Sequence, residues 1–90
     1  MPRARIECIV AGSPRTHERI THVGGTGGGG WRWTVENVIA SIEAKTNEFF
    51  TEVGGNVAEV GVVHGPTRKH LRTHADGKWN DNLLSLPDCR

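Results

Sequence analysis

Histidine and cysteine are the residues of this sequence best suited to metal or nucleophilic chemistry, and the chain has five His and two Cys. His70 and His74 share one face of an expected strand, but at about 3.3 Å per residue they lie about 13 Å apart, too far for one zinc ion. No Cys-x-x-Cys or His-x-His pair is present to start a zinc site, and a long-range set such as Cys8, Cys89 and His22 is the remaining alternative. We therefore expect no metal and no cofactor, with the histidines facing solvent.

Two carboxylates, an arginine and an amide form the best candidate for an active constellation: Asp76, Asp81, Arg72 and Asn82. Such a set could hold a metal or a phosphate. Turn chemistry explains the same residues, because Asp76 precedes Gly77 in a turn, and Asp81 or Asn82 can cap the leucine-rich turn that follows. Arg72 would then pair with Asp76. We favour this structural interpretation and assign no catalytic residue.

A glycine-rich segment, residues 24–30, precedes the clearest helix. Gly25, Gly27 and Gly30 have the spacing of the dinucleotide-binding fingerprint. However, a tetraglycine run satisfies almost any glycine pattern, and the expected strands do not form a βαβ unit. We interpret the segment as a flexible loop, with anion binding at the helix start as the alternative.

Aromatic and charged residues suggest two kinds of surface. Trp31 could stack on bases or ligand rings beside the charge of Arg32, whereas Trp33 is expected to act as a hydrophobic staple at the helix start. Residues 36–59 contain five Glu and one Lys, a net charge of −4, whereas residues 64–74 carry three bases and no acid. This dipolar distribution favours oriented association, but it offers only a small phosphate footprint.

The overall composition limits the class of protein. The 90 residues carry a formal charge of +1, which excludes a polyelectrolyte binder, and no apolar run is long enough for a membrane span. A chain of this length predicts a single domain over residues 1–90 with no deep chamber. The beginning of the sequence does not fit a secretory signal, so we expect a cytoplasmic location with Cys8 and Cys89 as free thiols. A disulfide between them is the alternative.

Hydrophobic periodicity predicts the elements before the sheet. A period-two pattern, in which Ile6, Cys8 and Val10 alternate with Arg5, Glu7 and Ile9, indicates a half-buried strand, and residues 20–23 form a second short extended piece. Thr34 is a suitable N-cap, and the apolar stripe that begins at Val35 recurs at the spacing of an amphipathic helix. We expect this helix to end near residue 44.

Three β-rich runs follow, residues 48–53, 57–64 and 69–75, separated by turn residues. They predict an antiparallel meander. The expected fold is therefore α+β, with one amphipathic helix packed on an antiparallel sheet of four to five strands in the order β-β-α-β-β-β.

Alternation along the meander predicts two faces. The face toward the helix is expected to carry Phe49, Thr51, Val53, Ala58, Val60, Val62, Leu71, Thr73 and Ala75. The opposite face is expected to carry Glu48, Phe50, Glu52, Glu59, His70, Arg72 and His74. Cross-strand ion pairs explain its charges, but a lone Phe50 contributes little to solubility, so a binding surface centred on Phe50 and Arg72 is the functional alternative.

Blocks of this sequence resemble a small uncharacterised bacterial domain family. The blocks are LRTHADG at 71–77 and DNLLSLPDC at 81–89, preceded in the same order by ITHVGG at 20–25, the helix stripe and Phe49-Phe50. The resemblance covers most of the chain after about residue 20. It implies one compact domain and supplies no reaction, ligand or catalytic residue.

Two function classes follow from these observations. The first is a small non-catalytic binding or assembly module that meets a protein, a second copy of itself or a small ligand through Phe50, Arg72, His70, His74, Trp31 and Arg32. The alternative is a weak nucleic-acid-binding domain that uses the basic 64–74 segment and Trp31. Salt-insensitive self-association would favour the first, and binding that is lost as salt rises would favour the second.

Overall fold

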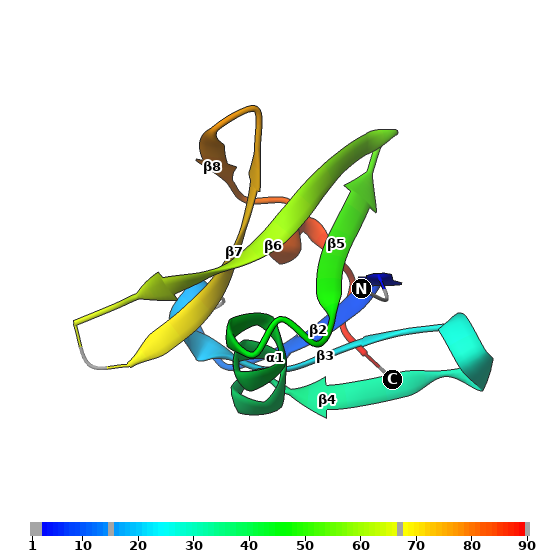
Figure 1. The fold of residues 1–90 in the computed structure, drawn as a ribbon, viewed down its shortest axis with the longest axis horizontal. Coiled ribbons are helices and arrows are strands. Elements are labelled where there is room, and N and C mark those ends of the chain that lie inside the picture. Colours follow the sequence, from blue (N-terminus) through cyan, green and yellow to red (C-terminus); the bar gives the residue numbers. More distant parts are fainter. Residues whose placement is uncertain (1–2, 15, 67, 90) are drawn as a thin grey trace.

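The computed structural model describes residues 3–14, 16–66 and 68–89. Its larger sheet has five strands in the order β1-β5-β6-β7-β8 (Figure 1). Strand β1 runs parallel to β5, and the other neighbours are antiparallel. The strands are β1 (Arg3–Arg5), β5 (Glu48–Val53), β6 (Asn56–His64), β7 (Lys69–Ala75) and β8 (Lys78–Asn80).

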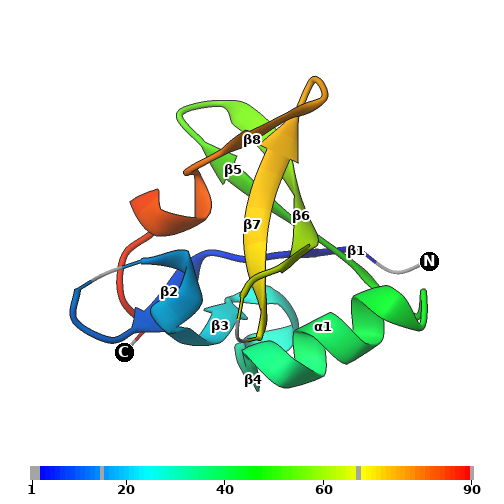
Figure 2. The same ribbon diagram turned by 90° about the vertical axis from the view of Figure 1, so that its left-hand side faces the viewer.

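A second, antiparallel sheet consists of β2 (Cys8–Ala11), β3 (Ile20–Gly25) and β4 (Trp31–Thr34). The single α-helix of the described residues, α1 (Val35–Glu43), follows β4 directly. Short 3-10 helices are η1 (His17–Arg19), η2 (Gly27–Gly29) and η3 (Leu83–Ser85). Figure 2 shows the larger sheet standing over the smaller one, with α1 beside both.

The predicted α+β class with one helix is confirmed, but the single sheet is wrong. Ile6 N donates to Phe50 O at 2.8 Å, whereas the next residue, Glu7, donates its N–H to Gly24 O at 2.7 Å. The expected first strand therefore leaves the larger sheet at Ile6 and enters the smaller sheet. Strands β1, β4 and β8 were not expected, and they raise the order to β-β-β-β-α-β-β-β-β.

The predicted helix boundaries are correct for local reasons. Thr34 Oγ1 accepts a hydrogen bond from Asn37 N at 3.2 Å, which satisfies one free donor of the first turn. At the other end, Lys45 has a left-handed backbone with φ of 58°, so the helix cannot continue. Val38 and Ile39 are buried, as the apolar stripe predicts.

The predicted inward face of the meander is also correct, whereas His70, predicted for the opposite face, lines a groove with Val35 and Ile39 of α1. Six of the residues expected to face the helix are buried: Phe49, Thr51, Ala58, Val60, Leu71 and Thr73. Two-residue turns at Gly54-Gly55 and Asp76-Gly77 have positive φ at both positions, the geometry that fits the twist of a hairpin. These turns fix the register of the strands that they join, and the register decides on which face each side chain lies.

The two cysteines form a disulfide, so the expectation of free thiols is wrong. The C-terminal segment runs beside β2, where Ile9 N donates to Pro87 O at 3.0 Å and Cys89 N donates to Ile9 O at 2.9 Å. This pairing brings Cys89 to Cys8 across a separation of 81 residues. Among the described residues, no helix is long and apolar enough to cross a membrane.

Candidate functional site

The outward side of the five-stranded sheet, called here the open face, carries one row of side chains across four strands. Phe50 on β5 is opposite Glu59 on β6, Glu59 is opposite His74 on β7, and His74 is opposite Trp79 on β8. Directly opposed residues on one face are close enough for their side chains to interact. The open face therefore presents two aromatic rings separated by a carboxylate and an imidazole.

Trp79 is the most prominent residue of this row, with 49% of its surface exposed. Its ring stands edge-on to His74, with centroids 5.2 Å apart. A Cβ on Gly61 would lie only 3.2 Å from the Trp79 ring and 3.1 Å from His74, so the glycine leaves the space that both rings use. Val57, on the same face of β6, is 50% exposed.

Trp79 was not among the residues predicted for this face, although the sequence contains the signal that places it. Asp76 and Gly77 form a two-residue turn, and such a turn pairs the residues on either side of it. Ala75 is then opposite Lys78, which makes His74 opposite Trp79. The register of this hairpin, counted from its turn, therefore identifies the His74–Trp79 pair.

Phe50 is covered on one side by Arg3, whose guanidinium carbon lies 4.8 Å above the ring centroid. Arg3 also donates to both carboxylate oxygens of Glu59, at 2.9 and 2.8 Å, and lies 3.5 Å from Glu48. The hydrogen bond from Arg3 holds the pKa of Glu59 below its usual value. Arg3 of β1 thus neutralises Glu48 and Glu59, two of the acids for which cross-strand ion pairs were expected.

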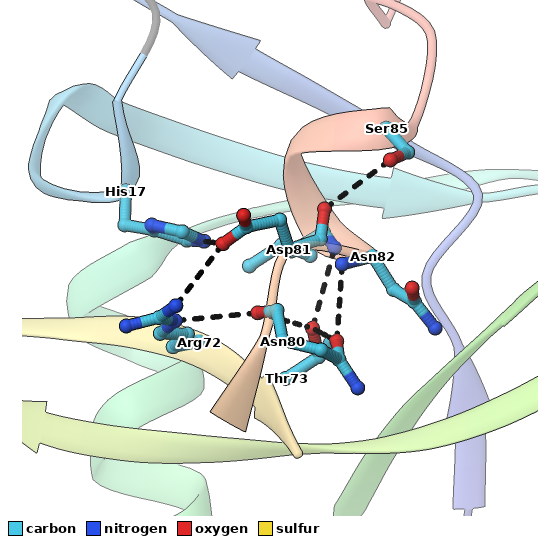
Figure 3. A network of polar contacts seen from close by, with 8 residues as sticks. His17, Arg72, Thr73, Asn80, Asp81, Asn82 and Ser85 are labelled. Atoms are coloured by element: carbon cyan, nitrogen blue, oxygen red, sulfur yellow. Dashed lines mark hydrogen bonds and ion pairs between the residues drawn. The ribbon is translucent and has the colours of Figure 1, made fainter. Parts of the chain in front are cut away.

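Arg72 lies on the open face but does not pair with Phe50. Strand β6 separates them, and Arg72 is opposite Gly61. Its Nε donates to Asn80 O at 3.2 Å and its Nη2 donates to Asp81 Oδ1 at 3.1 Å (Figure 3). The expected pairing of Arg72 with Asp76 is also wrong, because Asp81 accepts from Arg72.

The predicted polar cluster mainly anchors the chain segment that follows β8. Thr73 is fully buried, and its hydroxyl donates to Asn80 O at 3.2 Å and also contacts Asn80 Oδ1. Asn80 Oδ1 accepts from Asn82 N at 3.0 Å, and Leu83 N donates to Thr73 Oγ1 at 3.4 Å (Figure 3). Asp76 belongs to the turn instead, with φ of 54°. The cluster thus unites Arg72, Asp81 and Asn82 without Asp76.

His17, which the sequence did not single out, joins this cluster from η1. Its Nε2 lies 3.6 Å from Asp81 Oδ1. Loss of solvation lowers the pKa of His17, and the charges of Arg72 and His70 lower it further, while Asp81 raises it. The lowered pKa means that the folded chain disfavours protonated His17.

We expect a pH dependence of stability from this histidine. Because its folded pKa lies below the ordinary value of 6.5, the free energy of unfolding is highest above that pH and falls as the pH drops through 6.5 toward the folded pKa. Urea unfolding at about pH 7.5 and about pH 5.5 measures the difference. His17→Gln should flatten it, and an equally steep fall in that variant would assign the effect to other groups.

Basic residues of the 64–74 segment are engaged within the fold. Arg68 donates to the backbone oxygen of Glu18, and Lys69 pairs with Glu43 at 2.7 Å. The start of β4, which carries Trp31 and Arg32, lies on the opposite side of the molecule from the end of β6 and the start of β7 (Figure 1). The structure therefore does not unite these residues into one surface.

The remaining candidates are resolved by local contacts. Gly24 and Gly25 belong to β3, and residues 27–29 form η2. The carboxylate of Glu7 accepts from Thr26 N at 2.7 Å and from Thr26 Oγ1 at 2.6 Å, which lowers the pKa of Glu7. The Glu7 carboxylate thus already occupies these donors of the glycine-rich segment. Within the described ranges, no group of three or more His, Cys, Asp and Glu side chains is placed to hold a metal ion.

A family model described as "Protein of unknown function (DUF3892)" matches residues 5–87. No curated protein matches the chain, and no solved structure does.

Proposed function

This chain belongs to the DUF3892 family, and we propose that it is a small non-catalytic binding and assembly module whose open face pairs with a second copy of the chain. The observation that carries the proposal is the position of its exposed apolar side chains. Among the described residues, three large hydrophobic side chains are exposed, namely Trp33, Val57 and Trp79. Val57 and Trp79 share the open face, where burial of an aromatic anchor contributes strongly to association.

The distribution of apolar side chains on the open face supports a second copy as the occupant. Phe50 lies on β5 and Trp79 lies on β8, with Val57 on the intervening strand β6. A two-fold axis near the middle of the sheet would place β5 of each copy over β7 and β8 of the other. Each Trp79 would then face the apolar side chains of Val57 and Phe50.

The internal ion pairs argue against nucleic acid as the occupant. Arg3 is neutralised by Glu59 and Glu48, and Arg72 contacts Asp81. Affinity for nucleic acid depends on bases that are available to contact phosphates. An oligonucleotide-binding role is therefore the weaker proposal, and the salt dependence of any binding separates the two.

Sedimentation velocity across a wide concentration range tests the assembly. We expect the apparent mass to rise from 9.8 kDa toward twice that value, with little change as salt rises, because the interface is centred on apolar groups. Trp79→Ala should remain monomeric. Trp33→Ala is the matched control, since Trp33 is similarly exposed but lies on the other sheet. A parent chain that stays monomeric throughout, or a Trp79→Ala variant that associates like the parent, would refute the proposal.

A further inference from the structure

A second surface, distinct from the open face, is an aromatic pocket between the two sheets. It has a volume of about 210 Å³ and is lined by Ala4, Trp31, Trp33, Asn47 and Phe49. Phe49 is buried, Trp31 is partly buried and Trp33 is 38% exposed. The pocket thus has an apolar floor and walls that reach the solvent.

The three rings beside the pocket pack against one another as an aromatic cluster. Trp31 and Trp33 have centroids 6.2 Å apart, and each lies 6.0 Å from Phe49. Their planes are inclined to one another by 77°, 49° and 63°. A group seated in the pocket lies beside all three rings, and a ring face attracts a cation within about 6 Å of its centroid.

Backbone geometry positions these rings. Trp31 and Trp33 alternate with Arg32 along β4, so both indoles lie on one side of the strand and Arg32 lies on the other. Gly25 is opposite Trp31, and a Cβ there would lie 2.9 Å from Trp31 Nε1. The glycine therefore gives the indole the space that it occupies beside the pocket.

We propose that this pocket binds a quaternary alkylammonium group. The lining contains no ionised side chain, and Asn47 Nδ2 already donates to Ser41 Oγ at 2.9 Å. Arg3 and Arg5, which flank Ala4, form their hydrogen bonds with Glu59 and with the backbone oxygen of Glu52. Ring faces carry negative potential and methylated ammonium groups are only weakly hydrated, so this lining favours a soft cation over an anion or a strongly hydrated one.

Titration with choline chloride, followed through the indole N–H resonances, tests the site. We expect the signals of Trp31 and Trp33 to shift and that of Trp79 to stay unchanged. Trp33→Leu keeps an apolar wall but removes one ring face, and it should weaken choline binding about three- to thirtyfold. Trp79→Leu is the matched control and should bind choline like the parent.

A neutral analogue separates cation recognition from apolar burial. The alcohol in which carbon replaces the quaternary nitrogen of choline has the same shape without the charge, and it should bind more weakly than choline by a similar factor. Equal binding of the two compounds, or no shift with choline, would overturn the proposal. A trimethyllysine amide is the second arm: tighter binding than choline identifies a methylated side chain as the source of the group, and weaker binding identifies a free head group.

Discussion

Breaking the Cys8–Cys89 disulfide is expected to lower the free energy of unfolding by about 4 kcal/mol. The bridge joins residues 81 positions apart, and closing a long loop removes much of the conformational freedom of the unfolded chain. It also holds the C-terminal segment against β2, where Cys89 N donates to Ile9 O. Urea unfolding with and without a reductant measures the change.

The double variant Cys8→Ser/Cys89→Ser is the control for this experiment, because its stability should be low and should not respond to reductant. A loss below about 1 kcal/mol on reduction would show that the segment is held without the bridge. Domains of this size have only about 5 to 15 kcal/mol of stability, so the expected loss is a large share. The cytoplasmic location expected from the sequence would keep these thiols reduced, and the fold would then lack this contribution.

Ile39→Ala is expected to cost about 2 to 4 kcal/mol of stability, because it leaves a cavity between the helix and the sheets. The sequence predicts the same cost for Ile42→Ala, but the structure ranks the two. Ile39 is buried, whereas Ile42 is only partly buried at the margin of the core, so its truncation should cost less.

Denaturant unfolding of both variants checks this ranking. Asn37→Ala is the matched control on the exposed side of α1 and should change stability by no more than about 0.5 kcal/mol. The N-cap bond uses the backbone of Asn37 and is retained. If Ile42→Ala cost more than Ile39→Ala, the helix would be rotated from the orientation described here.

Local patterns were sufficient to predict the helix and the inward face of the meander. The N-cap at Thr34 and the burial of Phe49, Leu71 and Thr73 follow from spacing alone. The division into two sheets does not, because it depends on which distant strand accepts from Ile6 and which from Glu7. A short alternating run of residues does not show that two adjacent N–H groups have partners in different sheets.

The dependence on distant partners also explains which contacts of the candidate sites could not be predicted from the sequence. Trp79 is an exception, because the register of the Asp76-Gly77 turn places it opposite His74 and so makes its position predictable. The interpretation of Trp33 as a staple considered only the neighbouring helix turn, whereas its ring lies 6.0 Å from Phe49, a residue of the other sheet. Pairs such as Arg3 with Glu59 and His17 with Asp81 likewise join distant parts of the chain.

The most direct test of the open face as an interface is a dilution series of the isotopically labelled chain, followed through its amide and indole resonances. We expect the concentration-dependent shifts to cluster on β5 to β8, with the Trp79 indole among the largest and the β4 amides unchanged. Spectra that do not change with concentration, or shifts confined to β4 and α1, would contradict the account.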